Sequence, residues 1–274
     1  MKKLRFTGIL IMALMAYETS VSQGLGDLIV GGKADANYLV TGYASPLIKG
    51  FAMGLNQGWY NTADTHKFPG GDLTLSVALV GAPSSDKLFT VDKSKLQELQ
   101  LDGVPASGKG HIPTFFGPTS TSQEFSLKDL PSQKYPVPPG VISRIPVPVA
   151  NIGIGLPKGF TIKIRYIPSV NLDKIAEQLE FSSMSLGLWG VGIMHDFKQY
   201  IPGLKSLPFS MSVFAGYTKF NMELVMDESK GQVGKTGVSS TTIQVLASKK
   251  LAVLTVYGGV GYDISSGDLS LKGT

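Results

Sequence analysis

Two basic side chains stand two residues apart in the segment from Phe160 to Tyr166, where Lys163 and Arg165 alternate with apolar residues. Successive side chains of a β-strand point to opposite faces, so the two bases share one face and the apolar residues share the other. In a barrel whose apolar face meets lipid, the bases point into the lumen, where they favour anions or pair with acids. In a soluble sandwich they lie on the solvated face instead.

A second group of candidate ligand residues lies between Asn56 and Asn61, where Trp59 and Tyr60 stand among polar amides. If the protein holds a solute, we expect this segment and the two bases to contact it. The same two aromatic residue types also form the interfacial girdle of membrane barrels. This girdle is the interpretation that we favour for Trp59 and Tyr60.

Catalytic, phosphate-binding and metal-binding motifs are incomplete. Gly234-Lys235-Thr236 imitates a P-loop, yet Ser229 stands where the first glycine belongs, and a strand-like stretch follows in place of a helix. No serine stands in a Gly-x-Ser-x-Gly motif. Three histidines lie in separate segments without metal-ligand spacing: His66, His111 and His195. We therefore expect no enzyme, with no catalytic residue, no metal site and no cofactor.

The first 22 residues have the pattern of a secretory signal peptide. Three bases within the first five residues precede the apolar run Gly8–Ala16, and small residues at Ser20 and Ser22 mark a cleavage site that leaves Gln23 first. Without residues 1–22 the chain has 22 bases and 19 acids, a net charge of +3 that is too mild to indicate nucleic-acid binding. The absence of cysteine excludes disulfides, thiolate metal sites and a cysteine-linked lipid anchor.

Three regions follow the signal peptide. Residues 24–45 have helical spacing that Pro46 should end, so residues 23–46 are predicted to be an N-terminal helix, packed on a sheet or lying inside a barrel as a plug. Residues 47–274 are predicted to form an antiparallel barrel. Within it, the Pro-rich stretch 92–147 is expected to be a long loop or insertion with at most edge strands.

Two-residue alternation predicts the individual strands. The expected strands are 50–55, 73–79, 87–91, 148–156, 160–168, 181–194, 208–221, 239–248 and 251–262. The fold class is therefore all-β, an antiparallel outer-membrane β-barrel with an N-terminal amphipathic helix. Nine strands are an odd number, whereas single-chain bacterial barrels have even numbers, so we expect a fragment of a longer reading frame with ten or more strands.

The predicted connections alternate in length. Tight turns at 157–159 and 248–250, with the longer exception 195–208, fall at one end of the barrel. Long connections fall at the other end: 58–70, 92–147, 169–180 and 226–237. A periplasmic N-terminus then places the tight turns inside the cell envelope and the long loops outside, as in bacterial barrels.

Several motifs resemble those of one protein family. They are Asp35–Leu39, Lys49–Phe51, Leu55–Ala63, Trp189–Pro202 and Leu207–Tyr217. The chain resembles an uncharacterised family of exported proteins from Bacteroidetes-type bacteria that are regarded as outer-membrane barrels. The resemblance implies location and fold but brings no activity and no site residues. A helix that precedes a barrel is also similar in architecture to long-chain fatty-acid channels, in which an N-terminal segment plugs the lumen.

We predict a protein of the cell outer membrane that acts as a passive channel or binding barrel for small, hydrophobic solutes. Its expected partners are outer-membrane lipid, the barrel-assembly machinery and the solute, with no nucleic acid. The first alternative is a structural or surface-interaction barrel whose loops bind partners. The second alternative is a soluble secreted β-sandwich. The third is a serine hydrolase in a barrel.

Overall fold

A computed structural model describes residues 30–105, 108–173, 176, 182–229 and 231–272. The predicted signal peptide, residues 1–22, therefore lies outside the described residues. Within the described residues, no helix is both long and apolar enough to span a membrane.

Helix α3 (Gly32–Leu55) continues through Pro46 and ends nine residues later than the sequence predicts. The strand expected at 50–55 is wrong because these residues form the last turns of the helix. An internal proline costs about 3 kcal/mol or more, and burial along both halves of this helix offsets that cost. Gly54 lies so close to strand β7 (Ile145–Leu156) that a Cβ atom there would meet Val147 Cγ2 at 2.5 Å. Gly50, Ala52 and Gly54 are small enough for this close packing. Because they alternate with larger apolar residues, the sequence imitated the two-residue pattern of a strand.

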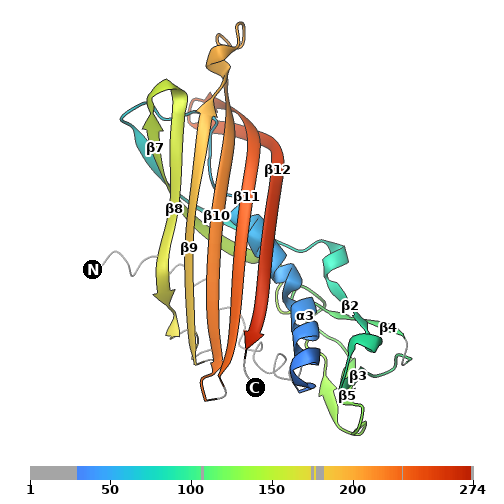
Figure 1. The fold of residues 1–274 in the computed structure, drawn as a ribbon. Helices are drawn as coiled ribbons and strands as arrows, with labels where there is room; N and C mark the ends of the chain where they lie inside the picture. Colours follow the sequence, from blue (N-terminus) through green and yellow to red (C-terminus); the bar gives the residue numbers. More distant parts are fainter. Residues whose placement is uncertain (1–29, 106–107, 174–175, 177–181, 230, 273–274) are drawn as a thin grey trace.

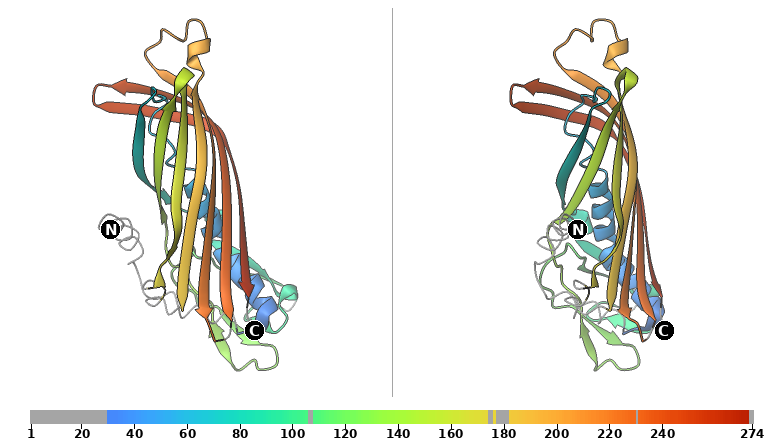
Figure 2. Two further views of the ribbon diagram at one scale, coloured as in Figure 1. Left: turned by 60° about the vertical axis from the view of Figure 1, so that its left-hand side comes forward. Right: turned by 90° about the vertical axis from the view of Figure 1, so that its left-hand side faces the viewer.

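The main sheet has seven antiparallel strands in the order β1-β7-β8-β9-β10-β11-β12. Their bounds are β1 (Gly71–Val80), β7 (Ile145–Leu156), β8 (Phe160–Asn171), β9 (Ser183–Asp196), β10 (Ser210–Asp227), β11 (Gln232–Leu251) and β12 (Leu254–Lys272). The sheet curls into a half-barrel, and α3 lies along its inner side (Figures 1 and 2). The antiparallel arrangement of the strands is as predicted. Among the described residues, β1 and β12 are the edge strands of the sheet.

The last strands are longer than the sequence predicts, and the long loop expected at 226–237 is wrong. β10 and β11 pair from Ser210↔Ser248 to Asp227↔Gln232, which leaves only a tight hairpin between them. The outer face of both strands becomes polar beyond Tyr217, with Lys219 and Glu223 on β10. The apolar residues of β10 change face there: up to Tyr217 most of them lie on the outer face, whereas Phe220 and Met222 pack on the inner side, so one continuous alternation does not extend to the end of the strand.

The stretch 92–147, predicted as a long loop or insertion with at most edge strands, contains short strands. β2 (Leu88–Asp92) pairs with β4 (Lys109–Pro113), and β5 (Glu124–Leu127) pairs with both β3 (Leu99–Leu101) and β6 (Lys134–Pro136). The strand predicted at 87–91 therefore exists as β2 but lies outside the main sheet. Single-turn helices join these strands and others: η1 (Ser84–Asp86), η2 (Lys93–Lys95), η3 (Pro157–Gly159) and η4 (Lys198–Tyr200).

The two small sheets pack against the N-terminal half of α3 (Figure 1). Their shared core contains Leu39 and Tyr43 of the helix with Leu99, Ile112 and Phe125 of the strands, all buried. We call residues 81–144 the cap. Its prolines interrupt any regular alternation, and its strands are only three to five residues long, so the sequence pattern resembled a loop.

The ends of the sheet differ from the prediction in one connection. Gly71 pairs with Ile154 beside the turn at Pro157–Gly159, so residues 56–70 lie at the same end as the tight turns. The cap and the start of α3 lie at the opposite end (Figure 1). Placing 58–70 among the other long connections was wrong because only β1 crosses the main sheet between 58–70 and 92–147, since the strand expected at 87–91 lies in a separate sheet as β2.

The face of the sheet toward α3 is mixed, with polar side chains around Arg165 and buried apolar ones such as Val147 and Phe214, whereas the opposite face is mainly apolar. We call these the inner face and the outer face. On β8, Lys163 and Arg165 are 3% and 1% exposed, whereas Tyr166 is 70% exposed. Exposed apolar residues of the outer face come from six strands: Leu73, Leu75, Val77 and Leu79; Ile152 and Ile154; Ile162, Ile164 and Tyr166; Trp189, Val191 and Ile193; Ile243 and Val245; Val256, Val260, Tyr262 and Ile264.

Asp35, fully buried in the first turn of α3, attaches the helix to the cap. Its carboxylate accepts hydrogen bonds from the amides of Gln97 (2.6 Å), Glu98 (2.9 Å) and Leu99 (2.7 Å). A negative charge in the first turn also interacts favourably with the helix dipole.

Asp35→Asn is expected to loosen the cap, because one carboxamide oxygen replaces two acceptors and leaves a buried amide unpaired. Each unpaired buried group costs about 1–3 kcal/mol. Urea unfolding of the detergent-purified protein, with proteolysis between residues 81 and 144 as a second measurement, tests this expectation. Asp129→Asn, at an exposed position of the same cap, is the control. Equal stability of the two variants would contradict the assigned role of Asp35.

Candidate functional site

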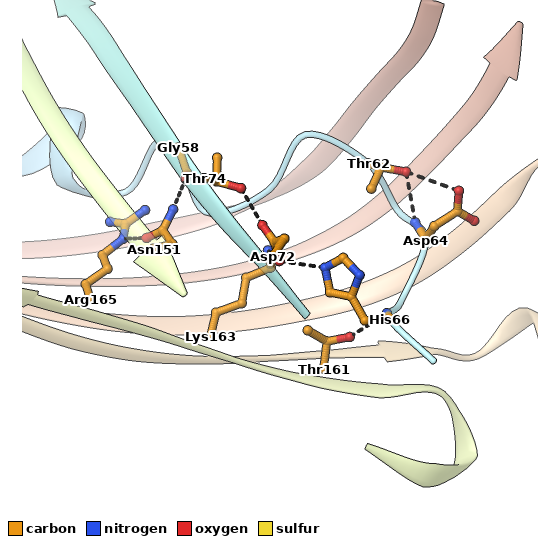
Figure 3. A network of polar contacts seen from close by, with 10 residues as sticks. All are labelled: Gly58, Thr62, Asp64, His66, Asp72, Thr74, Asn151, Thr161, Lys163 and Arg165. Carbon is orange, nitrogen blue, oxygen red and sulfur yellow. Dashed lines mark hydrogen bonds and ion pairs between the residues drawn. The ribbon is translucent and has the colours of Figure 1, made fainter. Parts of the chain in front are cut away.

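Arg165 is the centre of a buried polar network at the C-terminal end of α3 (Figure 3). Its guanidinium donates to the carbonyl of Leu55, the last helical residue, and to that of Gln57 at 2.6 Å. Nε donates to the side-chain oxygen of Asn151 on β7. Asn151 in turn donates to the carbonyl of Gly58, so one base holds the end of the helix and the segment after it.

The positive charge of Arg165 is balanced without a carboxylate. None of the ion pairs among the described residues includes Arg165. The carbonyl end of a helix carries the negative end of its dipole, which stabilises a nearby cation. The Arg165 Cζ atom also lies 3.5 Å from the ring centroid of Trp59, a favourable cation–π contact.

Trp59 is 1% exposed and lies against the inner face, so the girdle interpretation does not fit this residue. Its ring centroid is 5.4 Å from that of Phe214. The indole lies over Gly192 and Gly216, which are directly opposite each other in the pairing of β9 with β10. Two glycines at one rung of the sheet thus provide the space for the ring. The unbroken β alternation of the flanking residues gave no sign of this arrangement.

The other predicted site residues are only partly brought together. Lys163 points to the inner face like Arg165 but contacts a different group, described below. Asn56 is buried and donates to the Ser265 hydroxyl at 3.3 Å, and the Tyr60 hydroxyl donates to the side-chain oxygen of Gln244. Asn61 is exposed. Trp59 and Arg165 are the pair that the structure joins.

A second polar group lies beside the first, around Asp72 at the start of β1 (Figure 3). One carboxylate oxygen of Asp72 lies 2.5 Å from His66 Nε2 and 3.5 Å from Lys163 Nζ, and the other accepts from the Thr74 hydroxyl at 2.5 Å. The His66 amide donates to the Thr161 hydroxyl at 2.9 Å. Sequence reasoning missed Asp72 and His66. The sequence did contain one indication: Asp72 is an acid on the face of the strand opposite Leu73, Leu75 and Val77.

Hydroxyl groups of the inner face hold residues 56–70, which we call the plug segment. Ser212 donates to the Ala63 carbonyl at 2.6 Å, and the Ala63 amide donates to Ser248 Oγ at 2.9 Å. Ser240 donates to the Ala52 carbonyl of α3 at 2.9 Å. The polar groups of the inner face are therefore largely satisfied by the backbone of α3 and of the plug segment.

The inner side keeps a few buried polar atoms without a protein partner, and water or a ligand could satisfy them. Within the described part of the chain these are Asn56 Oδ1, Trp59 Nε1, Ser76 Oγ and Thr242 Oγ1. No group of three or more metal-ligating side chains occurs among the described residues. The arrangement is suited to holding polar groups in place, and it offers no paired nucleophile and base at the Arg165 network.

Arg165→Lys is expected to destabilise the protein by about 2–4 kcal/mol, because one ammonium cannot serve three separately placed acceptors and leaves buried carbonyls unpaired. Chemical unfolding of the purified protein in detergent, followed by Trp fluorescence, measures the loss. Arg144→Lys is the matched control at an exposed position. Similar unfolding curves for both variants would show that Arg165 does not hold the helix end.

Gly216→Ala is expected to displace Trp59, because the new Cβ would lie 2.8 Å from Phe214 Cζ and 3.0 Å from Trp59 Cε2. Overpacking of this kind costs about 1–3 kcal/mol. Adding Trp59→Phe should recover part of the loss, since the smaller ring leaves room for the methyl group. Gly258→Ala is the control, because a Cβ there meets nothing within 4 Å. An additive double variant would contradict contact between the two positions.

Comparison with known proteins identifies a family but no function. A family model described as a family of unknown function, DUF6588, matches residues 1–274. No curated protein and no solved structure matches this chain. The chain, with its curled antiparallel sheet and enclosed helix, therefore belongs to the DUF6588 family of unknown function.

Proposed function

We propose that this protein is a bacterial outer-membrane β-barrel protein that acts as a conduit or binding barrel for small solutes, with α3 and the plug segment closing its interior. The exposed face of the sheet carries the proposal: the inner face, partly polar and partly apolar, is buried against the protein's own helix and plug segment, while the apolar outer face is exposed on six strands. An apolar surface of this extent is costly in water and suits lipid.

The dimensions of the apolar surface support membrane insertion. On β12 it runs from Val256 to Ile264, eight residue steps or about 26 Å along the strand, which a tilt of about 35–45° reduces to about 20 Å across the membrane. Three aromatic residues border it toward the cap end. Tyr166 pairs with Trp189 across β8 and β9, and the Trp189 and Tyr217 ring centroids are 5.4 Å apart. Barrels carry an apolar band about 25 Å tall between such aromatic rows.

Strand direction supports closure by further strands. β1 and β12 terminate a run of seven antiparallel strands, so they run in the same direction. They cannot pair with each other in antiparallel fashion. An odd number of additional strands between them would close an antiparallel barrel with an even total, the number that bacterial barrels have.

The part of the inner face around Arg165 favours a polar or anionic solute over a hydrophobic one. Its buried side chains include Thr161, Lys163, Arg165, Thr218 and Thr242. Passage of any solute requires the plug segment to move, because the backbone of this segment occupies the donors and acceptors of the inner face. The enclosed N-terminal helix is the feature that supports the architectural similarity to long-chain fatty-acid channels, and no solute follows from it.

A structural or surface-interaction role is the second candidate, and the cap favours it. The cap has its own buried core with α3 and lies at one end of the sheet, clear of the apolar outer face. The exposed apolar face argues against a soluble sandwich. Bilayer transport separates the first two candidates, since an interaction protein needs no opening of the plug segment.

A disulfide lock tests the proposed function. Thr62 Oγ1 and Ser248 Oγ lie 3.0 Å apart, close enough for a disulfide between cysteines at these positions. The Thr62→Cys/Ser248→Cys protein should be recovered with the outer membrane and migrate differently on a denaturing gel before and after boiling. In vesicles, reduction should raise solute uptake by the oxidised double variant. The native chain contains no cysteine, so reductant should leave it unchanged.

Two results would contradict this proposal at different points. Recovery in the soluble fraction without a heat-dependent mobility shift would contradict membrane insertion. A membrane-inserted double variant that transports equally little when oxidised and when reduced would contradict a movable plug and favour the interaction role.

A further inference from the structure

A polar hollow of about 720 Å³ lies on the outer face of β8 to β12. It begins where the apolar surface ends, and Tyr166, Trp189 and Tyr217 line its border. Gly187 and Gly237 contribute to its lining, so the absence of side chains helps to form the depression. The hollow is separate from the polar networks of Arg165 and Asp72, because no residue of either network lines it.

Strand register arranges the outer-face side chains of the hollow in rows. Lys219 of β10 pairs with Ser239 of β11, which pairs with Ser266 of β12. The next rows, two residues further along each strand, are Asn221, Gly237 and Asp268, followed by Glu223, Lys235 and Ser270. A cation and two hydroxyls thus stand side by side, with a carboxylate in the adjoining row.

The charges of the hollow balance, but only half of them are paired. Lys235 Nζ lies 2.9 Å from Glu223 Oε2. Lys219 and Asp268 are exposed and form no ion pair with any described residue. They lie two strands and two residues apart, about 12 Å between Cα positions from regular sheet spacing. The hollow therefore presents one free positive and one free negative charge, with zero net charge.

We propose that this hollow binds the headgroup of a zwitterionic phospholipid. The phosphate accepts hydrogen bonds from the Lys219 ammonium and from the hydroxyls of Ser239 and Ser266, while the headgroup ammonium lies against Asp268. The acyl chains follow the apolar surface beyond Tyr217. Charge complementarity selects this class, because an anionic headgroup would satisfy Lys219 and leave Asp268 beside added negative charge. The inference rests on the proposed membrane insertion.

Quenching of Trp189 by brominated lipid tests the site in the full chain. Trp189 lies beside Lys219 on the outer face, and Trp189→Phe identifies its share of the emission. Vesicles contain brominated phosphatidylethanolamine in unlabelled phosphatidylglycerol, or the reverse labelling at the same composition. Quenching by the zwitterionic lipid should reflect an association about twofold to fivefold stronger than that of the anionic lipid, the size expected for exposed ion pairs.

Charge variants assign the preference to the hollow. Lys219→Glu and Asp268→Lys should each abolish it, and the double variant, which exchanges the two charges, should restore it in part. Lys249→Glu should keep the native ratio, because this exposed lysine of β11 pairs with Val256 at the opposite end of the apolar surface from the hollow.

The outcomes separate the site from the proposed function on which it rests. Equal quenching by both lipids, or a preference that survives all charge variants, would overturn the headgroup site while membrane insertion stands. Stronger quenching by the anionic lipid would overturn the zwitterionic class. Absence of quenching by either lipid would overturn membrane insertion together with the site.

Discussion

The contact between Arg165 and the carbonyl end of α3 is the interaction on which the inner side of this protein depends. A buried cation without a carboxylate partner is unfavourable unless other groups replace its lost hydration. Here the carbonyls of Leu55 and Gln57, the Asn151 amide and the Trp59 ring do so. Each of these groups is fixed by the same guanidinium, so the helix end, β7 and the plug segment hold their positions together.

The opposite end of α3 follows the same electrostatic rule with the opposite sign. Asp35 brings a buried negative charge to the first turn and binds three amides of the cap. The helix is thus held between an acid at its positive end and a base at its negative end, which compensates for its internal proline. Attachment at both ends explains how one helix can connect the cap to the far end of the sheet.

The sequence predicted the parts of the fold in which the two faces of a strand differ in polarity. The alternation around Lys163 and Arg165 correctly indicated a strand, and both bases do share the inner face. The continuation of β10 and β11 was missed because most apolar residues of β10 change from the outer face to the inner face after Tyr217. The helical residues 50–55 were mistaken for a strand because close packing selected alternating small residues. The Asp72–His66 contact depends on how the plug segment returns to β1, which no local pattern encodes.

The outer and inner faces of the sheet differ in their contacts, and this difference determines how the interior can open. The outer face packs against nothing in the described chain, so its geometry does not depend on the plug segment. The inner face, in contrast, is bonded to that segment through hydroxyls and Arg165, groups that water can replace in kind. Displacement of the plug segment would therefore exchange protein hydrogen bonds for water hydrogen bonds and leave the strand ladder intact. The movement would also expose the apolar contacts of Trp59 and Ala63 with Phe214, a cost that opposes it, while the ladder between the strands keeps the curved sheet in place.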